Sequence, residues 1–265
     1  MSSCEGSFDC GVLRISRSST FAQDDNFAWY LSEMTWIKIC GMTNLEDALV
    51  AVEAGADAVG FVFYEKSPRN ISVEAARAIV DKLPEGVEKV GVFVGETTET
   101  VFEISEKAEL TIAQTYPDFN NPLSIPDDRF LEKASFRVIV ALPASQLQQG
   151  ESEDPNVIAG FRASSKFRDR VVAVLLDSGT SNRPGGTGKK FDWQSAVPMA
   201  DLMSHIGLRL IVAGGLTPGS VGDSMRALKP WGVDVVSGVE TSPGKKDPEK
   251  VRAFVRAVRD SERSL

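Results

Sequence analysis

The chain has 265 residues, 42% of them hydrophobic and 25% charged, a composition typical of a globular protein with one large domain or two small ones. Its formal net charge of −8 argues against a nucleic-acid-binding surface, and no apolar run reaches the roughly 18–20 residues of a membrane span. A bound anion must therefore be held by local groups, since the field of the whole protein does not attract it.

Residues 1–34 show little periodicity, and we expect a disordered N-terminal extension there, followed by one folded domain over 35–265. The extension is too acidic for a transit peptide and lacks the apolar core of a signal peptide. Met34, just before the first expected strand, offers an alternative start. A cytoplasmic protein is the expectation, and the low number of cysteines (Cys4, Cys10 and Cys40) fits a reducing compartment.

From Trp36 onward, a strand followed by a helix recurs roughly every 25–35 residues. The expected strands are compact apolar runs, as in parallel sheets with both faces covered. Their predicted ranges are 36–40, 58–63, 89–94, 110–115, 137–142, 171–176, 208–213 and 233–237.

Helix signals follow most of these strands. The predicted helices are one capped by Thr43 or Asn44, one capped by Ser72, one from about Thr97, one near Asp192, one opened by Pro218 and one over 247–259. The single histidine, His205, lies where the helix near Asp192 should end, which favours a helix-end position over catalysis.

Eight such units within about 225 residues predict an α/β fold of the (β/α)8 TIM barrel type. A doubly wound open sheet is the alternative, but it would place a glycine-rich loop after the first strand. Here the glycine pairs follow strands six, seven and eight, which favours the barrel.

Several chemically useful residues fall at the carboxyl ends of the expected strands, where barrels place their sites. Cys40 ends strand one and Asp177 ends strand six, while Gly214-Gly215 and Ser237-Gly238 follow strands seven and eight. Glycine in such loops lets backbone N–H groups approach an anion closely. Arg69, after Pro68, offers a planar fork suited to a carboxylate or a phosphate.

Each of these residues has a structural explanation when taken alone. A free cysteine is often a core residue, an aspartate can cap a loop, and glycines after strands usually serve turn geometry. Their shared position at one end of the barrel is what points to a site.

The motifs that carry these residues resemble the phosphoribosylanthranilate isomerase family of tryptophan biosynthesis. The resemblance runs from about Trp36 to Val258 and touches nearly every strand end. The matching motifs are Lys38-Ile-Cys-Gly, Gly60-Phe-Val-Phe, Ser67-Pro-Arg, Leu176-Asp-Ser, Gly185-Gly-Thr-Gly, Phe191-Asp-Trp, Ala213-Gly-Gly-Leu-Thr-Pro and Val236-Ser-Gly-Val-Glu-Thr-Ser-Pro-Gly.

This resemblance implies an isomerase that converts an aminoaldose phosphate into an aminoketose phosphate by an Amadori rearrangement. It implies that Asp177 is the general acid, that Cys40 is the general base and that Arg69 holds the anthranilate carboxylate, with Gln114 lining the pocket. The phosphate of the phosphosugar substrate would be held by Gly214, Gly215, Ser237 and Gly238. The implied reaction calls for no metal and no cofactor, and either a monomer or a homodimer is compatible with it.

The implied chemistry needs a protonated Asp177 and a deprotonated Cys40, the reverse of their preference in solution. Lys38 lies two residues before Cys40, so both side chains project from the same face of the strand. Its ammonium either favours the Cys40 thiolate or packs and pairs inside the barrel, and the sequence leaves both readings open.

The chain departs from the family after strand four, where Gln114-Thr115-Tyr116-Pro117 stands in place of the usual Gln-Leu-His-Gly. Pro117 must reshape this turn, because proline fixes φ and removes a donor. Residues 144–168 also form a longer and more polar segment than the family's usual fifth helix.

Three other functions compete with this one. The related barrel isomerase of histidine biosynthesis uses two aspartates, and Cys40 speaks against it. Indole-glycerol-phosphate synthase needs a lysine and glutamate set that the sequence does not offer. A catalytically silent phosphosugar-binding barrel would need neither Cys40 nor Asp177.

Overall fold

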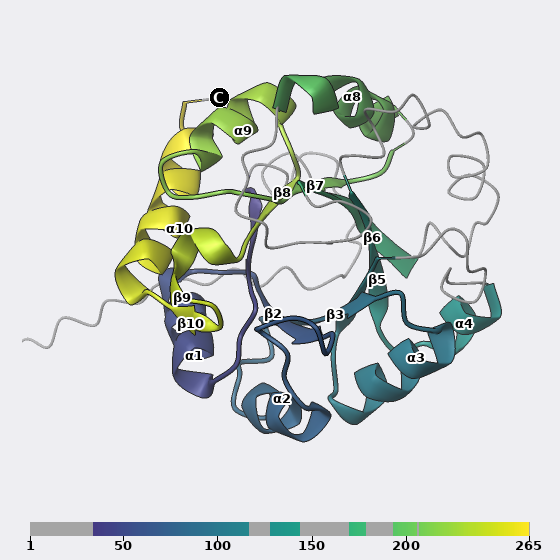
Figure 1. Ribbon diagram of the computed structural model, residues 1–265. Coiled ribbons are helices and arrows are strands. Elements are labelled where there is room, and N and C mark those ends of the chain that lie inside the picture. Colours follow the sequence, from purple (N-terminus) through teal and green to yellow (C-terminus); the bar gives the residue numbers. More distant parts are fainter. Residues whose placement is uncertain (1–33, 117–127, 144–169, 179–192, 206, 265) are drawn as a thin grey trace, which may run out of the picture.

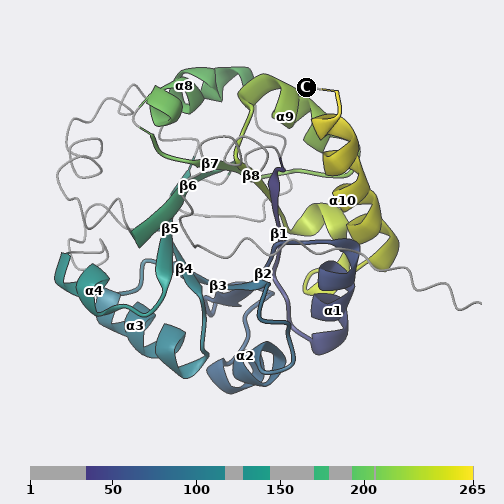
Figure 2. The ribbon, with the colours of Figure 1, turned by 180° about the vertical axis from the view of Figure 1, so that it is seen from behind.

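Strands and helices alternate in the computed structural model, which describes residues 34–116, 128–143, 170–178, 193–205 and 207–264. Eight strands form a closed barrel in the order of the chain, and every neighbouring pair is parallel. Figures 1 and 2 show the strands in the centre and the helices around them. The predicted (β/α)8 barrel is therefore confirmed.

The strand ranges agree closely with the sequence prediction. They are β1 (Trp36–Cys40), β2 (Ala58–Phe63), β3 (Glu88–Val94), β4 (Ile112–Tyr116), β5 (Arg137–Pro143), β6 (Val171–Asp177), β7 (Leu210–Val212) and β8 (Gly232–Val235). β7 is shorter than expected, and β8 ends before Ser237, which instead begins a 3-10 helix.

The helices lie outside the barrel. They are α1 (Leu45–Ala54), α2 (Val73–Val80), α3 (Thr98–Lys107), α4 (Asp128–Lys133), α8 (Val197–His205), α9 (Val221–Leu228) and α10 (Pro248–Glu262), with 3-10 helices η3 (Trp193–Ala196) and η4 (Ser237–Val239). A small hairpin of β9 (Glu240–Ser242) and β10 (Lys245–Lys246), which the sequence analysis missed, follows η4.

The predicted caps of the first two helices and the predicted start of the third near Thr97 are confirmed. The side chains of Asn44, Ser72 and Thr97 each accept a hydrogen bond from a backbone N–H in the first turn of α1, α2 and α3. His205 ends α8, as expected.

The prediction that Pro218 opens a helix is wrong, because α9 begins three residues later at Val221. Ser220 donates its backbone N–H to the Thr217 carbonyl oxygen and accepts the Thr217 N–H on its hydroxyl. These bonds close a turn over 217–220, so Pro218 lies in the turn and not in the helix.

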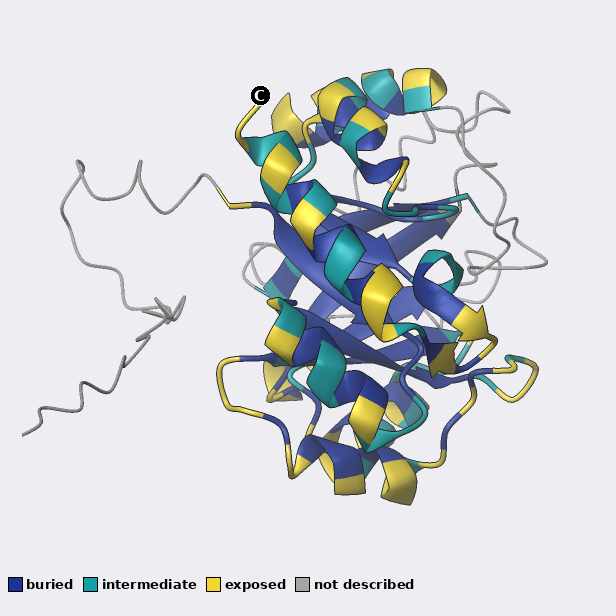
Figure 3. Ribbon diagram, turned by 90° about the vertical axis from the view of Figure 1, so that its left-hand side faces the viewer, coloured by how far each residue is buried: buried dark blue, intermediate teal, exposed yellow. Residues whose placement is uncertain are grey.

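Alternate residues of each strand face the barrel interior and the surrounding helices. Along β1, Trp36 and Cys40 belong to the interior cluster, whereas Ile37 and Ile39 belong to the larger cluster between sheet and helices. Figure 3 shows the barrel strands largely buried and many exposed residues on the outer helices. The pattern explains why both faces of the strands are apolar and why a polar residue at an inward position stands out.

Thr35, just before β1, is hydrogen-bonded to the last helix, α10. The Thr35 backbone N–H donates to Glu262 of α10, and Arg259 donates to the Thr35 carbonyl oxygen over 2.8 Å. α10 lies beside α1 in both views (Figures 1 and 2). The predicted extension over 1–34 lies, apart from Met34, outside the described residues.

None of the helices in the described ranges combines the length and apolar character that crossing a bilayer requires. Residues 144–168 and Pro117 lie outside the described residues.

Candidate functional site

A cavity opens at the carboxyl ends of the strands, and four of the predicted site residues line it. Its volume, as bounded by the described residues, is about 70 Å³. The lining residues are Cys40, Val62, Tyr64, Ser67, Arg69, Val92, Val94, Gln114, Tyr116, Asp177, Asp234 and Val236. The predicted acid, base, arginine and glutamine thus come together from four different segments, because barrel closure brings all strand ends to one rim.

Cys40 is the last residue of β1 and points into the barrel, 3% exposed. Gly60 of β2 stands beside it, and a Cβ atom there would lie 2.6 Å from the Cys40 sulfur. A glycine is therefore required at this position to leave room for the thiol.

Burial raises the pKa of the Cys40 thiol, and the nearby Asp234 carboxylate adds to this effect. Lys38 and Lys246 act in the opposite direction without outweighing it. The charge of Lys38 thus favours the Cys40 thiolate, as hypothesised, but burial outweighs it and the pKa of Cys40 is raised overall.

Lys38 is fully buried and makes two polar contacts inside the barrel. Its Nζ lies 3.1 Å from Asp234 Oδ1, directly across from it in the register of β1 and β8, and donates to Gln114 Oε1 over 2.9 Å. Burial acts to lower the pKa of Lys38, but its pairing with Asp234 outweighs burial and raises this pKa. Lys38 is therefore a charged ammonium that pairs inside the barrel, and its effect on the Cys40 thiolate stays a prediction.

Asp177 ends β6 and is 4% exposed. Its Oδ2 accepts a hydrogen bond of 2.9 Å from the hydroxyl of Tyr116, the last residue of β4. The Tyr116 hydroxyl lies 3.4 Å from Gln114 Nε2, which is the donor of that contact. The predicted general acid is thus held from one side by a buried phenol.

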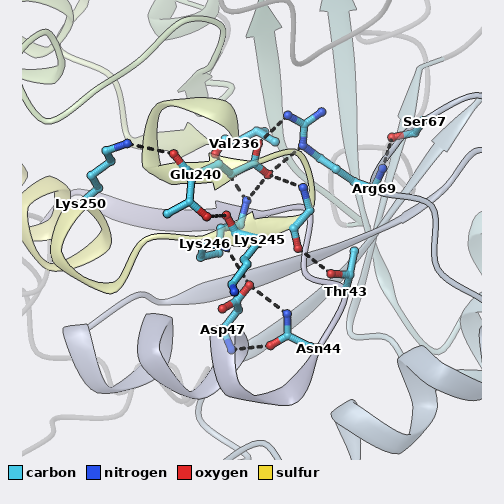
Figure 4. A network of polar contacts seen from close by, with 12 residues as sticks. Thr43, Asn44, Asp47, Ser67, Arg69, Val236, Glu240, Lys245, Lys246 and Lys250 are labelled. Atoms are coloured by element: carbon cyan, nitrogen blue, oxygen red, sulfur yellow. Dashed lines mark hydrogen bonds and ion pairs between the residues drawn. The ribbon is translucent and has the colours of Figure 1, made fainter.

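Arg69 follows β2 and is paired with Glu240 of the β9–β10 hairpin. Arg69 Nε and Nη2 donate to Glu240 Oε1 and Oε2 over 2.8 and 2.6 Å, which leaves Nη1 as the guanidinium nitrogen facing away from Glu240 (Figure 4). Lys246 Nζ also binds Glu240 Oε1 over 2.9 Å, and the Gly244 N–H donates to the same oxygen. One buried carboxylate therefore orients two cations.

The same hairpin is fastened to the start of α1. The Lys246 backbone N–H donates to Asp47 Oδ2 over 2.7 Å, and the Thr43 hydroxyl donates to the Gly244 carbonyl oxygen over 2.6 Å (Figure 4). Arg69 is thus positioned by a hairpin that is itself anchored to the loop after Cys40.

The four residues predicted to hold a phosphate do not line this cavity but lie on the neighbouring loops. Gly214 and Gly215 have φ angles of +84° and +65°, which favour glycine, and a Cβ on Gly214 would lie 2.3 Å from the Ser178 nitrogen. Gly238 packs against the next loop so closely that a Cβ would lie 1.8 Å from the Leu216 carbonyl oxygen. The loops after β6, β7 and β8 therefore meet, with Ser178 directly following Asp177.

Sequence reasoning missed four residues of this site: Tyr116, Asp234, Glu240 and Lys246. Two of them carry a signal that could have found them. Asp234 is a lone acid in an otherwise apolar strand, and Tyr116 lies two residues after Gln114 and so on the same face. Glu240 lies in the quoted motif Val236-Ser-Gly-Val-Glu-Thr-Ser-Pro-Gly but was given no role there, and Lys246 carries no such signal, since its hairpin was not predicted.

The predicted loop Gly185-Gly186-Thr187-Gly188 lies outside the described residues. Among the residues that the structure describes, no group of three or more His, Cys, Asp or Glu is placed to hold a metal ion.

Comparison with known proteins identifies relatives over most of the chain. Residues 37–257 match the family model described as N-(5'-phosphoribosyl)anthranilate (PRA) isomerase. An N-(5'-phosphoribosyl)anthranilate isomerase from Trichlorobacter lovleyi is 42% identical over 228 residues, which cover 86% of this chain and 100% of the relative.

Two solved structures have the same fold. The phosphoribosyl anthranilate isomerase from Thermotoga maritima is 38% identical with a TM-score of 0.69, and the match covers 86% of this chain and 100% of that one. A phosphoribosyl anthranilate isomerase in complex with reduced 1-(o-carboxyphenylamino)-1-deoxyribulose 5-phosphate is 35% identical with a TM-score of 0.66, at the same coverage.

Proposed function

Because the chain belongs to the N-(5'-phosphoribosyl)anthranilate isomerase family, we propose that it rearranges N-(5-phosphoribosyl)anthranilate to 1-(2-carboxyphenylamino)-1-deoxyribulose 5-phosphate in tryptophan biosynthesis. Asp177 is the general acid and Cys40 the general base. The observation that carries this assignment is that both side chains line one cavity at the carboxyl end of the barrel.

The first step opens the furanose ring. Asp177 donates its proton to the ring oxygen while the bond between that oxygen and C1 breaks. The nitrogen lone pair forms a C=N bond with C1, which gives a protonated Schiff base and leaves the Asp177 carboxylate. Asp177 is only 4% exposed and lines the cavity, so it meets the substrate in a place sheltered from bulk solvent.

The second step moves the proton at C2. The Cys40 thiolate removes it, the bonding electrons form a C1=C2 bond, and the positive charge on nitrogen is neutralised to give an enolamine. Tautomerisation of the enolamine then gives the aminoketose.

The raised pKa of the Cys40 thiol bears on how this base is generated. Before substrate binds, the thiol form therefore prevails at neutral pH. The Schiff base brings a positive nitrogen close to Cys40, and this charge favours the thiolate by the same Coulomb attraction that Lys38 exerts. The Cys40 thiol then releases its proton to solvent, and the resulting thiolate acts as the base in the second step.

Substrate binding uses the remaining predicted residues. Arg69 offers Nη1 to the anthranilate carboxylate while Glu240 holds its other two nitrogens. The glycine loops after β7 and β8 allow backbone N–H groups to approach the phosphate, through Gly214, Gly215, Ser237 and Gly238. We assign this isomerase to residues 35–265.

Two single variants test the proposal. A fluorescence assay follows the loss of phosphoribosylanthranilate, and Cys40→Ala and Asp177→Asn should each lower turnover by at least about a hundredfold. Affinity for inorganic phosphate should stay close to that of the wild type, because neither side chain belongs to the phosphate loops. Full activity in either variant refutes its role, and a wild-type protein that binds phosphate without turnover is a silent binding barrel.

A further inference from the structure

A line of buried polar side chains runs through the barrel interior from beside Cys40 to Asp177. Lys38 Nζ donates to Gln114 Oε1 over 2.9 Å. Gln114 Nε2 donates to the Tyr116 hydroxyl oxygen over 3.4 Å. The Tyr116 hydroxyl donates to Asp177 Oδ2 over 2.9 Å. Each of the four side chains in this chain of bonds is at most 8% exposed.

The Lys38 ammonium fixes the donor and the acceptor in each of these three hydrogen bonds. The Lys38 ammonium has donors only, so Gln114 must turn its carbonyl oxygen toward it. The amide nitrogen of Gln114 then faces Tyr116, whose oxygen accepts. The hydroxyl hydrogen of Tyr116 is therefore left for Asp177, although the contact from Gln114 is the longest and weakest of the three.

This direction has a consequence for the proton on Asp177. Oδ2 accepts the Tyr116 hydrogen, and in a carboxylic acid the carbonyl oxygen is a better acceptor than the hydroxyl oxygen, so this bond favours Oδ2 as the carbonyl oxygen. A neutral Asp177 therefore carries its proton on Oδ1. Burial, followed by the charge of Asp177, raises the pKa of Tyr116 well above its ordinary value, so the phenol keeps its hydrogen throughout the working pH range.

The chain of bonds orients these groups and does not conduct protons. A carboxamide such as Gln114 does not readily take up a proton on one side and release one on the other. The hydrogen bond that Tyr116 donates also stabilises the carboxylate that Asp177 becomes after it has protonated the substrate.

We propose that Tyr116 is a positioning residue for the general acid, and that its hydroxyl, oriented by Gln114 and Lys38, keeps the transferable proton of Asp177 on Oδ1. The proposal rests on the proposed function, in which Asp177 protonates the substrate.

Tyr116→Phe removes the hydroxyl and keeps the ring that fills the interior. We expect kcat to fall roughly tenfold to a hundredfold, because the acid loses its fixed orientation. The lower midpoint of the pH profile of kcat/KM reports the first proton that the pair of Asp177 and Cys40 loses. This is the Asp177 proton, because Cys40 is the weaker acid. This midpoint should move to higher pH, since the carboxylate is less stabilised.

Thr115→Val is the matched control. It removes a buried hydroxyl one residue earlier on β4, on the opposite face of the strand, where the described part of the chain offers that hydroxyl no hydrogen-bond partner. Its kcat and its pH profile should match those of the wild type. A loss in Thr115→Val equal to that in Tyr116→Phe would mean that the strand, and not the Tyr116 hydroxyl, is responsible, and would overturn the proposal.

Replacement of the tyrosines by 3-fluorotyrosine covers the case in which Tyr116→Phe fails to fold. The chain has three tyrosines, and the fluorinated phenol keeps its shape but is a stronger donor. The acidic midpoint should then move to lower pH. A midpoint that stays at the wild-type pH with fluorotyrosine, or a folded Tyr116→Phe whose kcat and midpoint both match the wild type, overturns the proposal.

Failure of the proposed function would look different. In that case the wild type shows no isomerase activity, or Asp177→Asn keeps full activity. A different pattern would refute only the role of Tyr116. In that pattern the wild type is active, Asp177→Asn is inactive, and Tyr116→Phe has the same kcat and pH profile as Thr115→Val.

Discussion

Arg69 and Glu240 are 171 positions apart in the chain and form a two-pronged ion pair at the rim of the barrel, with N–O distances of 2.8 and 2.6 Å. The pair joins the loop after β2 to the hairpin after β8. It uses two of the three guanidinium nitrogens, so the fork proposed to hold a substrate carboxylate is already fixed in direction before any ligand arrives.

We predict that Glu240→Gln lowers the free energy of unfolding by about 3–5 kcal/mol, because Arg69 and Lys246 would keep their charges with the shared carboxylate gone. KM should rise at the same time, since Arg69 is free to turn. Urea unfolding and steady-state kinetics measure the two effects. Glu249→Gln is the control, because it breaks an exposed ion pair with Arg252 and should cost no more than about 0.5 kcal/mol.

The same glutamate predicts how stability depends on pH. Burial acts to raise the pKa of Glu240, but hydrogen bonds and charges from Arg69 and Lys246 outweigh it and lower this pKa below its ordinary value. A group with a lowered folded pKa stabilises the protein above its unfolded pKa, and the contribution is lost as pH falls through the folded pKa.

The difference in unfolding free energy between the wild type and Glu240→Gln should therefore be constant near neutral pH. It should shrink as pH falls below the ordinary glutamate value of 4.5. Urea unfolding at a series of pH values checks this, and a difference that grows toward acid pH would contradict it.

Lys38→Met should make the Cys40 thiol harder to ionise. The Lys38 ammonium acts to lower the pKa of Cys40. It also pairs with the Asp234 carboxylate, whose charge acts to raise the pKa of Cys40. Without the ammonium, the midpoint for alkylation of Cys40 by iodoacetamide should move to higher pH, and the rate below that midpoint should fall.

This experiment is best done after Cys4→Ser and Cys10→Ser, which leave Cys40 as the single cysteine. Lys245→Met, which removes an exposed lysine, should leave the midpoint in place. An alkylation profile that is the same with and without Lys38 would show that Lys38 serves packing and pairing alone.

Gly238→Ala should weaken phosphate binding. A Cβ atom there would lie 1.8 Å from the Leu216 carbonyl oxygen, so the loops after β7 and β8 would have to separate. We expect the inhibition constant of inorganic phosphate to rise at least about tenfold, the worth of one hydrogen bond to a charged group.

Gly219→Ala is the matched control for that change. Its added Cβ would lie 3.9 Å from the nearest heavy atom, the Thr217 hydroxyl oxygen, which is ordinary contact. Equal phosphate inhibition in the two variants would remove Gly238 from the proposed phosphate site.

The sequence predicted the barrel well because the signals it used are local. Compact apolar runs mark strands, and Asn44, Ser72 and Thr97 cap helices through bonds that span three residues. The same local reading failed at Pro218, where a turn and a helix start share the same signal.

By itself, then, the sequence determined which residues end strands, and so placed Cys40 and Asp177 at one rim. Only the tertiary structure decided what surrounds them: Lys38 meets Gln114 across 76 positions, Tyr116 meets Asp177 across 61, and Arg69 meets Glu240 across 171. The physical reason is that strand ends follow from neighbouring residues, whereas these contacts depend on strand register and on the closure of β1 onto β8.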